Sequence, residues 1–255
     1  MFDLTYDGTY EGLLSAIFEG FRSKLTIRRI VPEQDYQTGF FDEPLHVATR
    51  PEWADRVRRG VERKTGRGGP KLLYRCFLSE QPDVELLILH FVQRAMAEST
   101  SVLEDYRDAR ILKLHQLDKK MGREIHRMHA FVRFQRTRDD IYTALIEPDF
   151  NVLPLIGDHF EKRYPAMDWL IYDTRRHYGL FHESSGSRFV TFPERDHLSL
   201  RQLKKELLEH EEVDYQSLWR TYFHSVNIPE RNNEKLHLQH VPRRYWKYLT
   251  EKGGG

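Results

Sequence analysis

Cysteine is almost absent from this chain of 255 residues, because Cys76 is the only one. A single thiol excludes an internal disulfide, a cysteine-rich zinc site and an iron–sulfur cluster held by this chain alone. Cys76 lies in an apolar run, where a thiol usually serves as a small packing residue. We therefore expect neither a metal nor another cofactor.

Long apolar runs are also missing. No stretch approaches the roughly 20 apolar residues that a transmembrane helix needs. The N-terminus, Met1 to Thr5, lacks the basic region and apolar core of a secretory signal. Hydrophobic content of 39% and charged content of 31% are typical of globular proteins in solution. We expect a cytoplasmic protein with no membrane partner.

Net charge is small, at +1, but it is unevenly distributed. Residues 107–138 hold ten Lys and Arg against three Asp and Glu, a net of +7. Residues 219–252 hold seven against three, a net of +4, which leaves −10 for the remainder. Because attraction to a polyanion depends on local charge density, two basic segments predict a phosphate-binding surface. A solvated helix face is the alternative.

The first basic segment is predicted to be a long helix that starts near Lys113. On a helical wheel, one side is apolar and another is basic. The apolar side consists of Leu114, Leu117, Met121, Ile125 and Met128. The basic side consists of Lys113, Lys120, Arg123 and Arg127. We expect the apolar side in the core and the basic side against water or a ligand.

Histidines form a third stripe on this helix. His126 and His129 are three residues apart and could share a metal ion. No cysteine or glutamate completes a recognised ligand spacing, however. Half-buried histidines that form hydrogen bonds are the interpretation we favour.

After the helix, alternation of apolar and polar residues predicts a β-hairpin with strands at 131–136 and 141–147. Val132 and Phe134 would point to one side, and Phe131, Arg133 and Gln135 to the other. An aromatic ring beside a guanidinium can stack a base and hold a phosphate of a single strand. An ordinary solvent-facing strand is the alternative.

The N-terminal half is predicted to be mostly helical. Thr9 is expected to cap a first helix, and the patterns Thr49 to Glu52 and Ser101 to Glu104 indicate capping boxes. The first helix should bury Leu13, Leu14, Ile17, Phe18 and Phe21. The glycine-rich residues 66–70 follow a helix and lack the Gly-Lys-Ser/Thr ending of a phosphate loop, so we interpret them as a turn.

Further strands are predicted at 28–34, 169–173, 178–182 and 188–192, and a short helix between 149 and 164. Most separations are too short for crossover helices. The predicted fold class is α+β, with a helix-rich N-terminal half packed on a mainly antiparallel sheet and a C-terminal helical extension. We expect an α+β core domain at 1–195 and a helical lobe with a basic aromatic tail at 196–255.

Four stretches carry a family resemblance. They are YDGTYEGLLSAIFEGF, GREIHRMHAFVRFQ, EPDFNVLPLIGDHFEKRYPAMDWLIYDTRRHYGL and WRTYFHSVNIPERNNEKLHLQHVPRRYWKYLTE. They resemble a bacterial family of probable DNA-metabolism or putative DNA-repair proteins, over nearly the whole chain. The resemblance implies a radical SAM protein, similar to photoproduct lyases, encoded nearby. In other bacteria a similar domain is fused to a uracil-DNA glycosylase domain. The resemblance brings no catalytic residues to this sequence.

The residues and the resemblance together favour a DNA-binding accessory protein that presents single-stranded or damaged DNA to such a partner enzyme. If folding joins the two basic segments, they form one cationic strip beside Phe131, Tyr245 and Trp246. The predicted nucleic-acid-binding residues are Lys120, Arg123, Arg127, Phe131, Arg133, Arg231, Arg243, Arg244 and Trp246.

Two alternatives remain open from the sequence. The chain could itself be a nuclease or a glycosidic-bond hydrolase, in which case the candidate acids, bases or metal ligands are His126, Asp149, His159 and Asp173. It could also be a scaffold that only stabilises the radical SAM partner.

Overall fold

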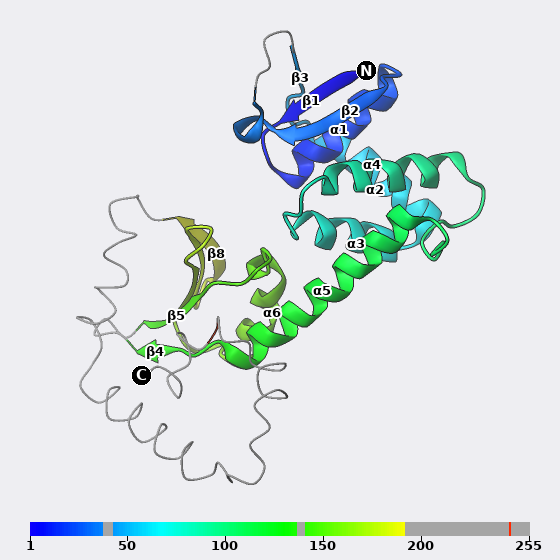
Figure 1. The fold of residues 1–255 in the computed structure, drawn as a ribbon. Helices are drawn as coiled ribbons and strands as arrows, with labels where there is room; N and C mark the ends of the chain where they lie inside the picture. Colours follow the sequence, from blue (N-terminus) through cyan, green and yellow to red (C-terminus); the bar gives the residue numbers. More distant parts are fainter. Residues whose placement is uncertain (38–42, 137–140, 192–244, 246–255) are drawn as a thin grey trace. The chain divides into compact units, whose positions relative to one another are not determined.

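The computed structural model describes residues 1–37, 43–136, 141–191 and 245, and the chain divides into two compact units, Met1–Gly122 and Arg123–Gly255. Helices and strands occur in both units (Figure 1), which confirms the α+β class. The predicted boundary at 195/196 lies outside the described residues and stays a prediction. The division at Gly122, inside one long helix, was not predicted.

The first unit contains a three-stranded sheet in the order β2-β1-β3, formed by Ile27–Pro32, Phe2–Tyr6 and Leu45–His46. Both strand pairs are parallel. The helices that accompany this sheet are α1 (Tyr10–Arg22), the short η1 (Glu33–Asp35), α2 (Pro51–Thr65), α3 (Gly68–Phe77) and α4 (Val84–Ala97). The expectation of mainly antiparallel pairing was made for the strands after residue 131, and this separate parallel sheet was not predicted.

The second unit contains a five-stranded sheet in the order β4-β5-β6-β7-β8. Its elements are β4 (Gln135–Arg136), β5 (Tyr142–Ile146), α6 (Leu153–Arg163), β6 (Trp169–Asp173), β7 (Tyr178–Glu183) and β8 (Gly186–Thr191). Three neighbouring pairs are antiparallel, and β5 pairs with β6 in parallel across the α6 connection. The strand predictions at 169–173 and 178–182 and the helix after 149 are confirmed.

The long helix α5 (Ala109–Phe131) belongs to both units and ends later than the sequence predicted. Phe131 is its last residue, and the N–H of Val132 still donates to the carbonyl of Met128. Phe131 and Arg133 are therefore not strand residues, and β4 is only two residues long. Val132 is buried four residues after the buried Met128, so the segment follows helical spacing as well as alternation.

Two of the three predicted helix caps differ in the structure. Thr9 does cap α1, because its Oγ1 accepts a hydrogen bond from the N–H of Gly12 at 2.9 Å. The capping box of Thr49 is wrong: α2 starts one residue later, at Pro51, and the preceding Arg50 is extended. A residue before proline is kept out of the helical region by its steric clash with the ring. The Thr49 hydroxyl donates instead to Asp7.

Asp108, and not Ser101 with Glu104, fixes the start of α5. Its Oδ1 accepts hydrogen bonds from the N–H groups of Arg110 and Ile111, at 2.8 and 3.3 Å. Its Oδ2 lies 2.6 Å from His90 Nε2 and 2.9 Å from Arg94 Nη1, both on α4. One carboxylate thus caps the helix and ties it to its neighbour.

Packing explains the remaining sequence expectations. Leu13, Leu14 and Ile17 are buried on α1, whereas Phe21 is 42% exposed and not part of the core. Cys76 is buried, its Sγ lies 3.2 Å from the carbonyl oxygen of Leu114, and burial raises its pKa to about 12. The thiol is therefore a packing residue, as predicted. Among the described residues, no helix is long and apolar enough to cross a membrane.

We expect Asp108→Ala to lower the free energy of unfolding by about 2 kcal/mol, because it removes a helix cap and an ion pair together. The matched control is Glu104→Ala, an exposed carboxylate four residues earlier, which should change stability by less than about 0.5 kcal/mol. Urea denaturation measures both values. Equal stability of the two variants would contradict the assignment of the cap to Asp108.

The stability that Asp108 supplies should depend on pH. Burial disfavours its ionised form, but the hydrogen bonds from His90, Arg110, Ile111 and Arg94 outweigh burial and hold the pKa of Asp108 well below its usual value. A depressed carboxyl pKa stabilises the folded state above the unfolded pKa of about 4 and loses that effect as the pH falls. The stability gap between the natural protein and Asp108→Asn should be largest above about pH 5 and shrink towards pH 3 in denaturation curves. A gap that stays constant over this range would contradict the prediction.

Candidate nucleic-acid interface

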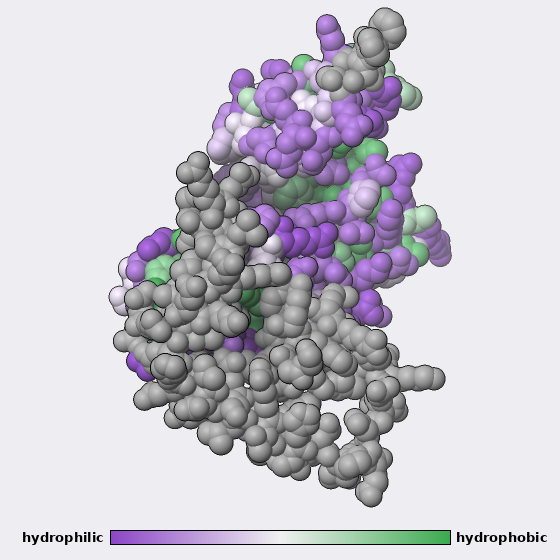
Figure 2. Space-filling view, turned by 60° about the vertical axis from the view of Figure 1, so that its left-hand side comes forward, coloured by the Kyte–Doolittle hydropathy of each residue, from purple (hydrophilic) through white to green (hydrophobic). Residues whose placement is uncertain are grey.

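Basic side chains on α5 are exposed and unpaired. In the first unit these are Lys113, Lys119 and Lys120, and in the second unit Arg123. Within the described residues, none of these four side chains forms a hydrogen bond or an ion pair. Lys120 and Arg123 were predicted as phosphate contacts, and Lys119 extends that set. Figure 2 shows a mostly hydrophilic surface on the visible described residues.

The acidic residues of α5 are engaged elsewhere. Asp118 Oδ1 lies 2.9 Å from Nε of Arg75 on α3. Glu124 is only 2% exposed and accepts a hydrogen bond from the N–H of Asp149 at 2.9 Å. Neither carboxylate neutralises Lys113, Lys119, Lys120 or Arg123, so the exposed side of the helix keeps its positive charge.

Glu124 is one of the buried acidic residues of the second unit. Besides the Asp149 N–H, its carboxylate accepts a hydrogen bond from the hydroxyl of Tyr245 and lies 3.3 Å from Arg127 Nη1. A buried carboxylate without such partners would carry a large desolvation cost. The sequence analysis missed this residue, although it lies within about 60° of the apolar stripe on the helical wheel. A single acidic residue beside an apolar stripe is the sequence feature that could have identified it.

Three predicted nucleic-acid-binding residues contact other parts of the protein. Arg127 pairs with Glu124. Arg133 Nη1 donates to the carbonyls of Ala130 and Val132, at 2.6 and 3.3 Å, and so caps the end of α5. The ring centroid of Phe131 lies 5.9 Å from that of Tyr245. Of the predicted cationic strip, Arg231, Arg243, Arg244 and Trp246 lie outside the described residues.

The acids proposed as catalytic lie at or beyond the carboxyl ends of two parallel strands: Asp173 is the last residue of β6, and Asp149 follows β5 in the loop. Ile146 and Asp173 are register partners at the ends of β5 and β6, so the loops that follow both strands meet at one edge of the sheet. Arg176 bridges these loops: it pairs with Asp173 at 2.9 Å and donates to the carbonyls of Pro148 and Asp149, both at 3.1 Å.

Asp173 forms hydrogen bonds that hold the turn after β6 in place. It is fully buried, and its Oδ1 accepts hydrogen bonds from the N–H groups of Arg175 and Arg176 in the turn that follows. Its other oxygen is the one paired with the Arg176 side chain. Arg176 was missed by the sequence analysis, although two arginines directly after a buried strand are an unusual pattern that could have identified it.

The histidine candidates lie on facing helices. His129 of α5 stacks on His159 of α6, with ring centroids 4.0 Å apart and an interplanar angle of 17°. Burial, together with the His159 and His126 imidazoles, lowers the pKa of His129. His126 is exposed. Among the described residues, no group of three or more His, Cys, Asp or Glu could hold a metal ion.

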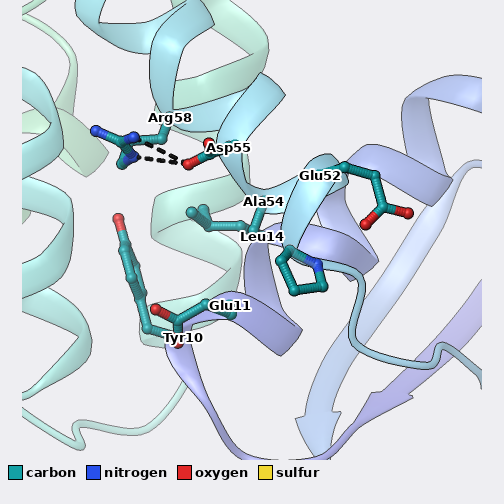
Figure 3. A pocket seen from close by; sticks show the side chains of 8 residues that line it. Tyr10, Glu11, Leu14, Glu52, Ala54, Asp55 and Arg58 are labelled. Atoms are coloured by element: carbon teal, nitrogen blue, oxygen red, sulfur yellow. Dashed lines mark hydrogen bonds and ion pairs between the residues drawn. The ribbon is translucent and has the colours of Figure 1, made fainter.

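The charged side chains that line one cavity in the first unit are mainly acidic, in contrast to the basic side of α5. The volume of this cavity is about 370 Å³, and its lining includes Glu11, Glu52 and Asp55 together with Tyr10 and Arg58. Figure 3 shows these side chains and the Asp55–Arg58 ion pair. Burial raises the pKa of Tyr10, so its hydroxyl stays protonated. Three carboxylates with one paired arginine repel a phosphate, and we exclude this cavity from the nucleic-acid interface.

Two variants test the Glu124 cluster. We expect Glu124→Ala to lower the free energy of unfolding by about 3 kcal/mol, because it removes the buried partner of Arg127. Tyr245→Phe should cost about 1 kcal/mol, because it loses one hydrogen bond and keeps the ring. Tyr106→Phe is the control, since Tyr106 is 53% exposed. If thermal denaturation finds Tyr245→Phe as stable as the control, the hydroxyl contributes nothing to the cluster.

Comparison with known proteins identifies a family. The model described as a domain of unknown function, DUF4130, matches residues 82–251, a range that starts just before α4 and includes all of α5 and the second sheet. No curated protein matches the chain. Because the matched range covers well over half of its length, the chain belongs to the DUF4130 family.

Proposed function

We propose that this protein is a DNA-binding accessory protein of DNA repair or metabolism, which presents single-stranded or damaged DNA to a partner enzyme. The observation that carries the proposal is the row of unpaired cations on α5, Lys113, Lys119, Lys120 and Arg123. Lysine and arginine side chains in this state can neutralise phosphates and release condensed counterions. The resemblance to DNA-metabolism proteins supports the same class of ligand.

Phosphate contact is the role we assign to these residues. Arg127 and Arg133 already have partners within the protein, and the Phe131 ring packs beside Tyr245. The freely exposed cations are therefore better placed than these three to meet a strand. Contacts of this kind position a nucleic acid without reading its sequence, and we expect affinity that is nearly independent of sequence.

Chemistry on the DNA is assigned to the partner enzyme. Both oxygens of Asp173 accept hydrogen bonds from the protein, and Arg176 ties it to the loop of Asp149. A carboxylate in this state joins the turn after β6 to the loop after β5. The resemblance implies a radical SAM protein as the partner, and such an enzyme would supply the reactive group.

Removing three of the α5 cations together tests the proposal. The variant carries Lys119→Ala, Lys120→Ala and Arg123→Ala, and each of these side chains is exposed and unpaired, so the fold should be retained. Binding to a fluorescent single-stranded oligonucleotide at low salt should weaken at least tenfold. The slope of log affinity against log salt should fall by about 0.7 for each phosphate that the variant no longer neutralises.

The matched control removes three exposed cations that lie off α5, by Arg63→Ala, Arg67→Ala and Lys71→Ala on α2, α3 and the turn between them. It changes net charge by the same amount but should alter affinity less than threefold. Equal weakening by both triple variants would show that charge in general, and not α5, attracts the strand. No binding by the natural protein at low salt would contradict the proposal itself.

A further inference from the structure

A second cavity of the first unit, the Trp53 pocket, differs in chemistry from the acidic one. It encloses about 260 Å³ between α1, the segment from β3 to the start of α2, and α2 itself. Its lining combines cations, aromatic rings and apolar groups: Glu19, Arg22, Leu45, His46, Val47, Ala48, Arg50 and Trp53. Cavities for drug-sized ligands start at about 300 Å³, so this one suits a smaller group.

Arg22 and Arg50 share one acidic neighbour, Glu19, so the pocket lining carries an excess of positive charge. The guanidinium of Arg50 lies 4.4 Å from the centroid of the Trp53 ring, and it forms no ion pair within the described residues. Arg22 also lies over Trp53, at 5.0 Å, but Glu19 holds it through two hydrogen bonds of 2.9 and 3.0 Å. A π face positions a cation without cancelling its charge, whereas a carboxylate cancels it.

The Trp53 ring also contacts a second aromatic ring. The Phe18 ring centroid lies 5.0 Å from that of Trp53, so the platform under Arg50 is fixed by packing. The backbone of Arg50 is fixed as well, because its N–H donates to Ser15 Oγ and its carbonyl accepts from the same hydroxyl. A preorganised guanidinium loses little freedom when it binds an anion.

The rim of the pocket offers an apolar contact beside this cation. Leu45 is 40% exposed, and the neighbouring His46 imidazole is exposed as well. An exposed leucine next to a planar ring can cover one face of a base or a sugar. Guanidinium groups bind phosphate oxygens in bidentate geometry. Cation and apolar rim together match a small molecule with one phosphate and one flat ring.

We propose that the Trp53 pocket binds a nucleotide unit, with Arg50 on the phosphate and Leu45 and His46 against the base or sugar. The nucleotide could be free or could be the 5′-phosphorylated end of a single strand. Neither α1, β3 nor α2 contributes to the basic face of α5. The site therefore goes beyond the proposed function, and either can fail without the other.

Calorimetric titration with deoxyadenosine monophosphate tests the pocket. Arg50→Ala should weaken binding at least tenfold, since it removes a charged hydrogen-bond partner. Arg50→Lys keeps the positive charge but loses the bidentate geometry of the guanidinium, so it should retain part of the affinity. Arg58→Ala is the matched control: it removes an exposed arginine of the acidic cavity, on α2, and should change binding less than twofold.

Two oligonucleotides distinguish the sources of the nucleotide. In the background of Lys119→Ala, Lys120→Ala and Arg123→Ala, a 5′-phosphorylated single strand is compared with the same strand ending in a 5′-hydroxyl. A preference of about fivefold or more for the phosphorylated end, lost in Arg50→Ala, assigns the pocket to DNA ends. Binding of the monophosphate without such a preference assigns it to free nucleotides. The proposal is overturned if neither probe binds, or if Arg50→Ala and Arg58→Ala have equal effects while circular dichroism shows both variants folded.

Discussion

The exposed positive charge of α5 depends on one interaction, the pairing of the nearby acids with other residues of the protein. Asp108 is bound by His90 and Arg94, Asp118 by Arg75, and Glu124 by Tyr245 and Arg127. Each acid meets a partner inside its own unit, so none is left to pair with the exposed lysines and Arg123. A chain with a net charge of only +1 can in this way keep a strongly basic helix face.

The same contacts also stabilise the helix. Asp108 caps its first turn, Glu124 ties its second half to the loop after β5, and Arg133 closes its last turn. Isolated helices are marginal in water and gain most of their stability from such tertiary contacts. The features that expose positive charge on α5 are therefore the ones that hold it in place.

Local patterns predicted the elements that depend on a few neighbouring residues. Thr9 caps α1, and the strand at 169–173 has the predicted bounds, because a cap or a buried apolar run is specified within the segment itself. The pattern at Thr49 failed because Pro51 moved the helix start by one residue. The pattern at Phe131 fitted both a strand and a helix, and packing around Met128 and Val132 decided for the helix.

Only the exposed residues of the candidate interface could be predicted from the sequence. Lys120 and Arg123 followed from helical periodicity, since a basic stripe opposite an apolar one must face outwards. Glu124 could not be interpreted in this way, because its partners, Asp149 and Tyr245, are 25 and 121 residues away. Asp173 was recognised as a candidate acid or base, which stays a prediction, but its pairing with Arg176 across the turn was not foreseen.

Lysine footprinting with bound DNA can show whether the exposed side of α5 contacts the strand. The protein is acetylated with and without saturating single-stranded DNA, and the modified lysines are quantified by mass spectrometry. Lys113, Lys119 and Lys120 should be protected several-fold, whereas the exposed Lys71 and Lys162, which lie off α5, should be modified equally in both samples. Equal modification of the three α5 lysines with and without DNA would contradict the account.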